Sequence, residues 1–273
     1  MEVRLFPNFR RPGVGLKPRR DGQRPFLPQH ARHCPVLEAG SSLGFLVYPP
    51  LAAEESYSIE YSGEGRYQFV YYVNPAGKEW LAIFSVTVVL PVGGIGAFRE
   101  EVALLAQKAG VTREEALLTM RTFIVPEDLG TPPGGLTLRG AWNFQTPPGW
   151  DSVYTPVFNM IERPVPPMMV IRVETDWYAS PVNLVLGLPP GPLHIGIGDP
   201  VAQAIFVPRT LRRPLLESVS EHDQLNLAAR KGLADWDRQH AEDRSLYKVL
   251  ARSAVGRIER EASPGPDEAG SPG

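Results

Sequence analysis

Proline and glycine punctuate this chain from end to end, and their spread limits its fold more than any other feature. The 273 residues include 29 prolines and 26 glycines, scattered rather than gathered in one tract. Proline inside a helix removes a hydrogen bond and clashes with the preceding turn, and both residues favour turns. We therefore expect short strands joined by turns, with long helices only where proline is absent.

Apolar, β-branched and aromatic segments recur at regular spacing along the middle of the chain, with turn residues between them. This spacing is typical of a mainly β fold built as a sandwich or barrel. Over residues 171–209, four apolar segments alternate with turns, and we expect them to form a four-strand meander. We predict a β-rich body over residues 34–213, whose first strands lie at 34–40, 43–50, 56–61, 67–73 and 80–90.

A short helical insert is expected within this body, at about residues 98–123. Good helix formers run from Phe98 to Lys108 and end at Gly110. Thr112 then stands three residues before Glu115, which is the spacing of a capping box at a helix N-terminus.

The ends of the chain differ from its middle. Residues 1–33 are rich in arginine and proline, and we expect an extended arm on the surface or on a partner subunit. Residues 214–260 lack proline after position 214, and their apolar residues recur near a helical period, which predicts an appendage of one or two helices. The composition of residues 261–273 predicts a disordered tail.

Charge and cysteine content restrict the classes of partner. The formal net charge is −2, which gives no bulk signal for a nucleic acid or an anionic membrane as partner. The one cysteine, Cys34, excludes an intrachain disulfide and is compatible with a reducing compartment. No apolar segment is long enough to cross a bilayer as a helix. We expect a cytoplasmic protein.

One cluster has the residue types of a soft-metal site. His30, His33 and Cys34 lie close in sequence, but their spacing brings them together only on a helix. The prolines at 28 and 35 oppose a helix there. We therefore predict no metal site.

The segment VETDWY combines two carboxylates with two aromatic side chains. Glu174 and Asp176 are two residues apart, so on a strand they share a face, where their repulsion would raise one pKa or favour a cation. Trp177 and Tyr178 would offer a flat stacking surface beside them. These four residues are our main candidates, with Glu174 and Asp176 as catalytic groups and with Glu174 and Trp177 in one pocket. The alternative is a polar turn in which Asp176 accepts hydrogen bonds from backbone amides.

Three further residues are candidate ligand-binding groups. Trp150 follows a Pro-Pro-Gly turn, where it forms either a pocket wall or the edge of the core. Gln203 and Asn183 lie in apolar strands, where an amide is tolerated only if it is hydrogen-bonded. Each amide therefore binds either a ligand or the backbone of the protein.

The order of these motifs resembles the dUTPase-like, or β-clip, superfamily over about residues 142–209. VETDW (173–177) is similar to that superfamily's strand-and-turn motif, GDPVAQ (198–203) to its last strand, and TPPGW (146–150) to the turn before its phosphate motif. The resemblance implies that Glu174 takes the place of the water-activating carboxylate, Trp177 that of the aromatic residue on the sugar, and Gln203 that of a strand amide. Mg²⁺ would be the cofactor of such a reaction. We expect a body of β-clip or jelly-roll type.

The same resemblance has departures that bear on activity. Residues 155–158 read Thr-Pro-Val-Phe where the superfamily grips phosphate, and Pro200 replaces an arginine, so a triphosphate would lack donors. A longer stretch, about residues 30–210, resembles an uncharacterised bacterial domain family of unknown function. That resemblance implies a shared fold and no activity.

The sequence therefore supports three classes of function. Our leading expectation is a small-molecule-binding β-domain protein, with a pocket near Trp150 and residues 174–177 and a possible place in specialised metabolism. The first alternative is a diverged nucleotide or phosphoester hydrolase, and the second is a non-catalytic assembly protein. We expect a homo-oligomer, with a trimer favoured by analogy with β-clip proteins.

Overall fold

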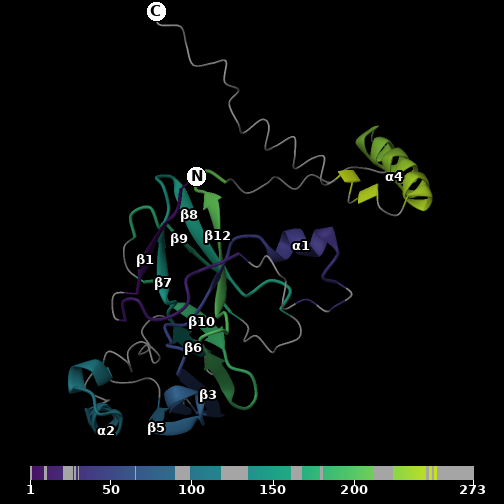
Figure 1. Ribbon diagram of the computed structural model, residues 1–273. Helices are drawn as coiled ribbons and strands as arrows, with labels where there is room; N and C mark the ends of the chain where they lie inside the picture. The colour runs from purple at the N-terminus through teal and green to yellow at the C-terminus, as the bar shows by residue number, and fades with distance from the viewer. Residues whose placement is uncertain are drawn as a thin grey trace, which may run out of the picture. The chain divides into compact units, whose positions relative to one another are not determined.

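The computed structural model describes most of the β body and one long C-terminal helix. The chain divides into two units, Met1–Leu211 and Arg212–Gly273. The fold is mainly β with antiparallel sheets, as predicted, and Figure 1 shows its elements. The residues described are 2–8, 11–20, 27, 29, 31–64, 66–89, 99–117, 135–160, 168–178, 181–211, 224–243, 246–247 and 249–250.

Two four-stranded antiparallel sheets form most of the first unit. In one sheet the strand order is β11-β3-β4-β5, and in the other it is β2-β12-β8-β9. Alternate side chains of β3 and β4 are buried, as expected for strands with one face on a core. The first sheet comprises β3 (Glu55–Gly63), β4 (Arg66–Val73), β5 (Leu81–Val89) and β11 (Leu193–Gly196); the second comprises β2 (Phe45–Val47), β8 (Trp150–Thr155), β9 (Ile171–Val173) and β12 (Ala202–Pro208).

Two two-stranded sheets complete the described β structure. One pairs β1 (Arg4–Pro7) with β7 (Trp142–Gln145), and the other pairs β6 (Gly135–Leu138) with β10 (Leu184–Gly187). All four residues of β1 are exposed, although the strand is hydrogen-bonded to β7 along its length. The N-terminal segment therefore adds a strand to the surface of the body.

The expected meander over residues 171–209 is wrong. Its four strands exist as β9, β10, β11 and β12, but none of them pairs with another of the four. Instead, β10 pairs with β6, β11 pairs with β3, and β9 and β12 both flank β8. Apolar alternation identifies a strand but carries no information on its partner, because every strand with one buried face has the same pattern.

A buried ion pair holds the N-terminal segment on the first sheet. Arg11 donates from Nη1 and Nη2 to the two carboxylate oxygens of Glu55, at 2.8 and 2.7 Å. The Tyr71 hydroxyl also donates to Glu55 Oε1 (2.5 Å), and the Ala52 N–H donates to Oε2 (2.7 Å). Burial acts to raise the pKa of Glu55, but these donors and the Arg11 charge outweigh it and hold the pKa below its usual value.

The helices agree with the sequence except at residues 34–40. The insert contains α2 (Arg99–Ala109), which ends before Gly110 at a φ of 66°. The capping box is present: the Thr112 N–H donates to Glu115 Oε2 (2.8 Å), and the Glu115 N–H donates to Thr112 Oγ1 (3.2 Å). The rest of the expected insert, after residue 117, lies outside the described residues.

Residues 34–40 were predicted as a strand, and this prediction is wrong. The segment forms α1 (Pro35–Ser41). Proline fits the first turn of a helix, where its missing N–H has no partner to lose, and Glu38 lies in that turn near the positive end of the helix dipole. The Cys-Pro start was therefore a helix signal that the apolar residues obscured.

One hydrophobic core joins the sheets of the first unit. Its buried members come from both four-stranded sheets and from both two-stranded sheets, so the small sheets connect the large ones. Phe144 of β7 packs edge-on against Phe206 of β12, with ring centroids 5.2 Å apart. Its buried members include Leu51, Tyr57, Ile59, Tyr67, Phe69, Phe84, Leu138, Phe144, Tyr154, Leu184, Leu186 and Ile195.

In the second unit, the described residues form the predicted helix. Helix α4 (Gln224–Glu242) carries exposed apolar side chains, including Leu227 and Leu233. Among the described helices, none is long and apolar enough to cross a membrane. The predicted tail, residues 261–273, lies outside the described residues.

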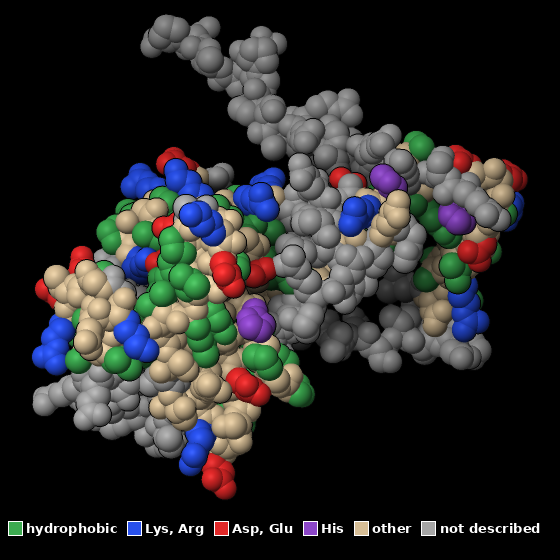
Figure 2. Space-filling view, turned by 60° about the horizontal axis from the view of Figure 1, so that its bottom comes forward, with side chains coloured by type: hydrophobic (Ala, Val, Ile, Leu, Met, Phe, Trp, Pro, Cys, Tyr) green, Lys and Arg blue, Asp and Glu red, His purple; other side chains and the backbone are tan. Residues whose placement is uncertain are grey.

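Figure 2 shows hydrophobic side chains in patches between charged ones on the face turned to the viewer.

Candidate functional site

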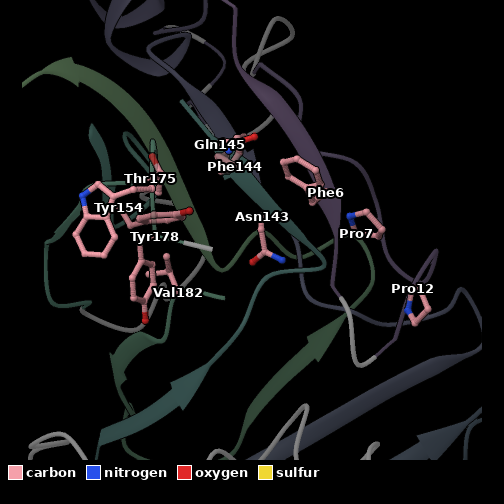
Figure 3. A pocket seen from close by; sticks show the side chains of 11 residues that line it. Phe6, Pro7, Pro12, Asn143, Phe144, Gln145, Tyr154, Thr175, Tyr178 and Val182 are labelled. Carbon is pink, nitrogen blue, oxygen red and sulfur yellow. The ribbon is translucent and has the colours of Figure 1, made fainter. Parts of the chain in front are cut away.

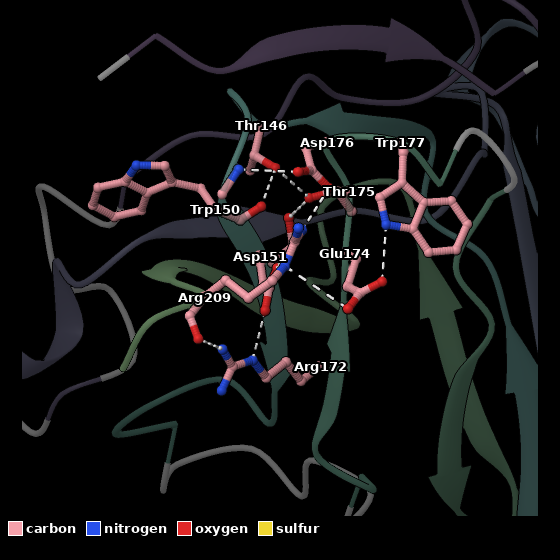
Figure 4. A network of polar contacts seen from close by, with 11 residues as sticks. Thr146, Trp150, Asp151, Arg172, Glu174, Thr175, Asp176, Trp177 and Arg209 are labelled. Carbon is pink, nitrogen blue, oxygen red and sulfur yellow. Dashed lines mark hydrogen bonds and ion pairs between the residues drawn. The ribbon is translucent and has the colours of Figure 1, made fainter. Parts of the chain in front are cut away.

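A network of charged side chains surrounds the turn that contains the carboxylate pair (Figure 4). At its centre is Asp151 of β8, which is 2% exposed. Arg172 of β9 donates to Asp151 Oδ2 (2.8 Å), and Arg209, just after β12, donates to Oδ1 (2.9 Å). A buried carboxylate loses its hydration, which costs free energy. The two guanidinium groups offset that cost because they neutralise the charge and donate hydrogen bonds to it.

Asp176 belongs to this network and has a structural role. Arg209 Nη2 donates to Asp176 Oδ1 at 2.6 Å, and the Gly149 N–H donates to Oδ2 at 3.0 Å. The hydrogen bond from Arg209 has the larger effect on the pKa of Asp176, and both contacts lower it. The expectation that repulsion raises a pKa is therefore wrong for Asp176, which fits the alternative of a carboxylate accepting from a backbone amide.

Asp176 thereby ties its own turn to the Pro-Pro-Gly turn before β8. Gly149 has a φ of 80°, and the Trp150 N–H donates to the Pro147 carbonyl at 3.2 Å. Proline at the second position and a left-handed glycine at the third are typical of a type II turn. The sequence prediction of a tight turn just before Trp150 is confirmed.

Three hydroxyl groups form a second, uncharged link below the same turn. Thr175 Oγ1 lies 2.9 Å from Thr146 Oγ1 and 2.6 Å from Ser152 Oγ. Thr146 Oγ1 also donates to the Trp150 carbonyl at 2.6 Å. All three side chains are buried, so these bonds fix the backbone from which Trp177 and Tyr178 project.

Glu174 is hydrogen-bonded to Trp177 and is itself partly exposed to solvent. Its side chain is 47% exposed, and its Oε1 lies 3.8 Å from Arg209 Nε. Glu174 Oε2 accepts a hydrogen bond from the indole N–H of Trp177 at 2.8 Å. Glu174 therefore contacts the indole N–H of Trp177, and it is not among the described residues that line the neighbouring cavity.

That cavity has a volume of about 530 Å³, and Trp177 is one of the residues that line it. Figure 3 shows the side chains around it. Its walls come from the N-terminal segment, from β7 and β8, and from the residues after β9. Of the described residues that line it, none carries a charge. They are Phe6, Pro7, Pro12, Asn143, Phe144, Gln145, Tyr154, Thr175, Trp177, Tyr178 and Val182.

Strand pairing explains one wall of the cavity. Phe6 of β1 lies directly opposite Asn143 of β7, so both side chains stand on the same face of this small sheet. Gln145 is two residues further along β7 and shares that face. An aromatic ring and two amides therefore line the same side.

The opposite wall is an aromatic corner. The rings of Trp177 and Tyr178 lie 6.1 Å apart between centroids, with an interplanar angle of 86°. The two rings do not form the flat surface that we expected from the sequence. They instead form a corner that offers one ring face and one ring edge.

The floor contains a tyrosine with an unused hydroxyl. Tyr154 of β8 is 3% exposed, and burial raises the pKa of its phenol. Its hydroxyl makes no hydrogen bond to any residue that the structure describes, and Tyr154 lines the cavity together with Asn143 (Figure 3). Within the described part of the chain, the side-chain amides of Asn143 and Gln145 likewise have no protein partner.

The other candidate residues lie away from this cavity. Gln203 is 1% exposed, its Oε1 accepts from the Phe158 N–H (3.0 Å), and its Nε2 donates to the carbonyls of Ser41 (3.2 Å) and Leu43. Its amide thus binds the backbone, which was one of the two expected roles.

Asn183 and Trp150 are also used inside the protein. Asn183 Oδ1 accepts from Arg139 Nε at 2.8 Å. Trp150 is the first residue of β8, pairs with Pro208 and does not line the cavity. Of the residues predicted to line a pocket, Trp177 and Tyr178 line the cavity, together with residues from β1, β7 and β8 that were not predicted.

Sequence reasoning missed most of the cavity. Phe6 comes from a strand far in the sequence from those of Asn143 and Tyr154, and no spacing rule connects the three residues. Among the described residues, no three His, Cys, Asp or Glu side chains are grouped so as to hold a metal ion, and His30 lies outside this set. No protein-family model matches the chain, and no curated protein is significantly similar to it.

Proposed function

We propose that this protein binds an uncharged small molecule in the cavity beside Trp177. The observation that carries the proposal is a recess of about 530 Å³ with aromatic walls and a few polar groups. Ligand cavities in proteins typically measure about 300–1,000 Å³ and have this mixture of apolar and sparse polar groups.

The chemistry of the lining favours a neutral ligand. The polar groups that the described residues offer are amides and hydroxyls. A charged ligand would lose its hydration on entering and would find no opposite charge among these residues. A phosphate ester in particular would lack the cationic donors that usually bind it, so the hydrolase alternative receives no support from this cavity.

Trp177 is the residue that we expect to contribute most to binding. The residue is 66% exposed, which is unusual for so large an apolar side chain, and its indole N–H is already bonded to Glu174. A ligand that covers the ring would remove apolar area from water without reorienting the side chain. The bond to Glu174 and the polar links beneath the turn keep the ring in place.

A neutral fluorescent probe, N-phenyl-1-naphthylamine, tests this function. We expect its fluorescence to rise on binding to the full chain, and we expect Trp177→Ala to weaken binding by about tenfold or more through lost aromatic contact area. Trp80→Ala is the matched control, because Trp80 is also exposed but does not line the cavity.

A cavity-filling variant separates this site from apolar surfaces elsewhere. Val182→Trp should occupy the recess and reduce probe binding, while the fold is retained by circular dichroism. If the probe binds equally to the wild type, Trp177→Ala and Val182→Trp, it binds elsewhere and the proposed function is wrong.

A further inference from the structure

The Tyr154 hydroxyl is the strongest sign of what the cavity recognises. A buried hydroxyl normally has a hydrogen-bond partner, and a missing partner costs free energy. Tyr154 is almost fully buried, lines the cavity and has no partner among the described residues. The hydroxyl oxygen is not among the fully buried atoms, so it is open to the cavity, where a ligand atom can replace water as its hydrogen-bond partner.

Asn143 and Tyr154 have complementary capacities. The phenol donates one hydrogen bond, and an asparagine side chain both donates and accepts. Both residues line the cavity, Asn143 from β7 and Tyr154 from β8. A ligand group that accepts at one atom and donates at the next would satisfy both.

The shape of the aromatic corner adds a second requirement. Because Trp177 and Tyr178 meet at 86°, a flat ligand can stack on one ring while its edge meets the other. A ligand that fills this corner must then carry its planar ring and its polar group together in one compact, neutral molecule.

Resting on the proposed function, we infer that the ligand carries a neutral carboxamide or lactam next to a planar ring. Its carbonyl accepts from the Tyr154 hydroxyl, its N–H donates to the Asn143 side chain, and its ring lies in the corner formed by Trp177 and Tyr178. Gln145 stands on the same face of β7 as Asn143 and extends the polar wall.

Four small probes test this inference: benzamide, benzoate, toluene and methyl glucoside. Benzamide has the ring and the neutral amide, benzoate replaces the amide with a charge, toluene lacks a polar group, and the glucoside lacks the planar ring. Each is titrated into the full chain and followed by NMR shifts of the backbone amides of residues 143–145 and 174–178. We expect benzamide to bind most tightly.

Two variants identify the groups that are responsible. Tyr154→Phe and Asn143→Leu should each weaken benzamide by about 3- to 10-fold, as for the loss of one hydrogen bond, and leave toluene unchanged. Tyr72→Phe is the matched control, because the Tyr72 hydroxyl lies 3.4 Å from Ser58 Oγ and outside the cavity. It should change neither affinity.

The outcomes separate this inference from the function on which it rests. If toluene binds as tightly as benzamide, or if both variants leave benzamide unchanged, the amide assignment is wrong and the cavity still binds neutral rings. If benzoate or methyl glucoside binds most tightly, the ligand class is charged or a sugar, and the inference is overturned. If none of the probes shifts these amides, both the inference and the proposed function fail.

Discussion

Two groups of buried polar side chains in the β body differ in how completely the protein satisfies them. Around Glu55, both carboxylate oxygens accept hydrogen bonds from Arg11, and each also accepts from a further donor. In the cavity, the Tyr154 hydroxyl has no partner among the described residues, and its oxygen is open to the cavity although the residue as a whole is almost fully buried.

The difference indicates which group serves the fold and which serves a ligand. A completed cluster stabilises the folded chain, because removing one member takes a hydrogen-bond partner from each of the others in a largely buried place. The Tyr154 hydroxyl is open to the cavity, where water can reach it, so it contributes little to the stability of the empty fold. The predictions below test that distinction through the stability of the protein.

The largest effect is expected for Glu55→Ala. The change leaves Arg11 and the Tyr71 hydroxyl without this partner in a region that is largely shielded from water, which should cost about 4 kcal/mol of unfolding free energy. Urea unfolding followed by tryptophan fluorescence measures the loss. Glu54→Ala, at an exposed neighbouring position, should change stability by less than about 0.5 kcal/mol, and equal effects of the two variants would refute the role of the cluster.

Asp151→Asn should have an intermediate effect. The carboxylate is buried, but its partners Arg172 and Arg209 are partly solvated, so we expect a loss of about 2 kcal/mol. Glu174→Gln serves as the comparison within the same network, because Glu174 is half-exposed and 3.8 Å from Arg209. It should cost less than about 1 kcal/mol in the same urea experiment, and a loss as large as that of Asp151→Asn would show that Glu174 belongs to the buried part of the network.

Acid should weaken the Glu55 cluster in a defined direction. The pKa of Glu55 is lowered in the folded protein from its ordinary value of 4.5, so the folded state binds this proton less readily than the unfolded state. The resulting stability is fully present above pH 4.5 and is lost as the pH falls through the lower folded pKa. The difference in unfolding free energy between the wild type and Glu55→Gln should therefore shrink below that pH, and a constant difference would contradict the assignment.

The smallest effect is expected for Tyr154→Phe in the absence of ligand. Removing a hydroxyl that has no partner should change stability by less than about 0.5 kcal/mol, whereas Tyr71→Phe loses a charge-assisted bond of 2.5 Å and should cost about 1.5 kcal/mol. Thermal unfolding of the two variants provides the comparison. A large loss for Tyr154→Phe would mean that its hydroxyl has a structural partner and would remove the main support for the ligand class.

Features that depend on neighbouring residues could be predicted from the sequence. The Thr112–Glu115 capping box, the turn before Trp150 and the strands β3, β4 and β5 all follow from contacts or periodicities within a few residues. Trp177 and Tyr178 were candidate residues because they adjoin the carboxylate pair of Glu174 and Asp176 in the sequence. These features hold because their physical causes are local.

The partners across the fold could not be predicted in this way. The sequence alone determined that the chain is mainly β, where its main turns lie, and that the 174–178 segment is a candidate site. Only the tertiary structure decided that Arg209 neutralises Asp151 and Asp176, that Glu174 accepts a hydrogen bond from Trp177, and that β1, β7 and β8 bring Phe6, Asn143 and Tyr154 around one cavity. The physical reason is that strand pairing depends on matching whole faces across long separations, while alternation along one strand is the same whichever partner it meets.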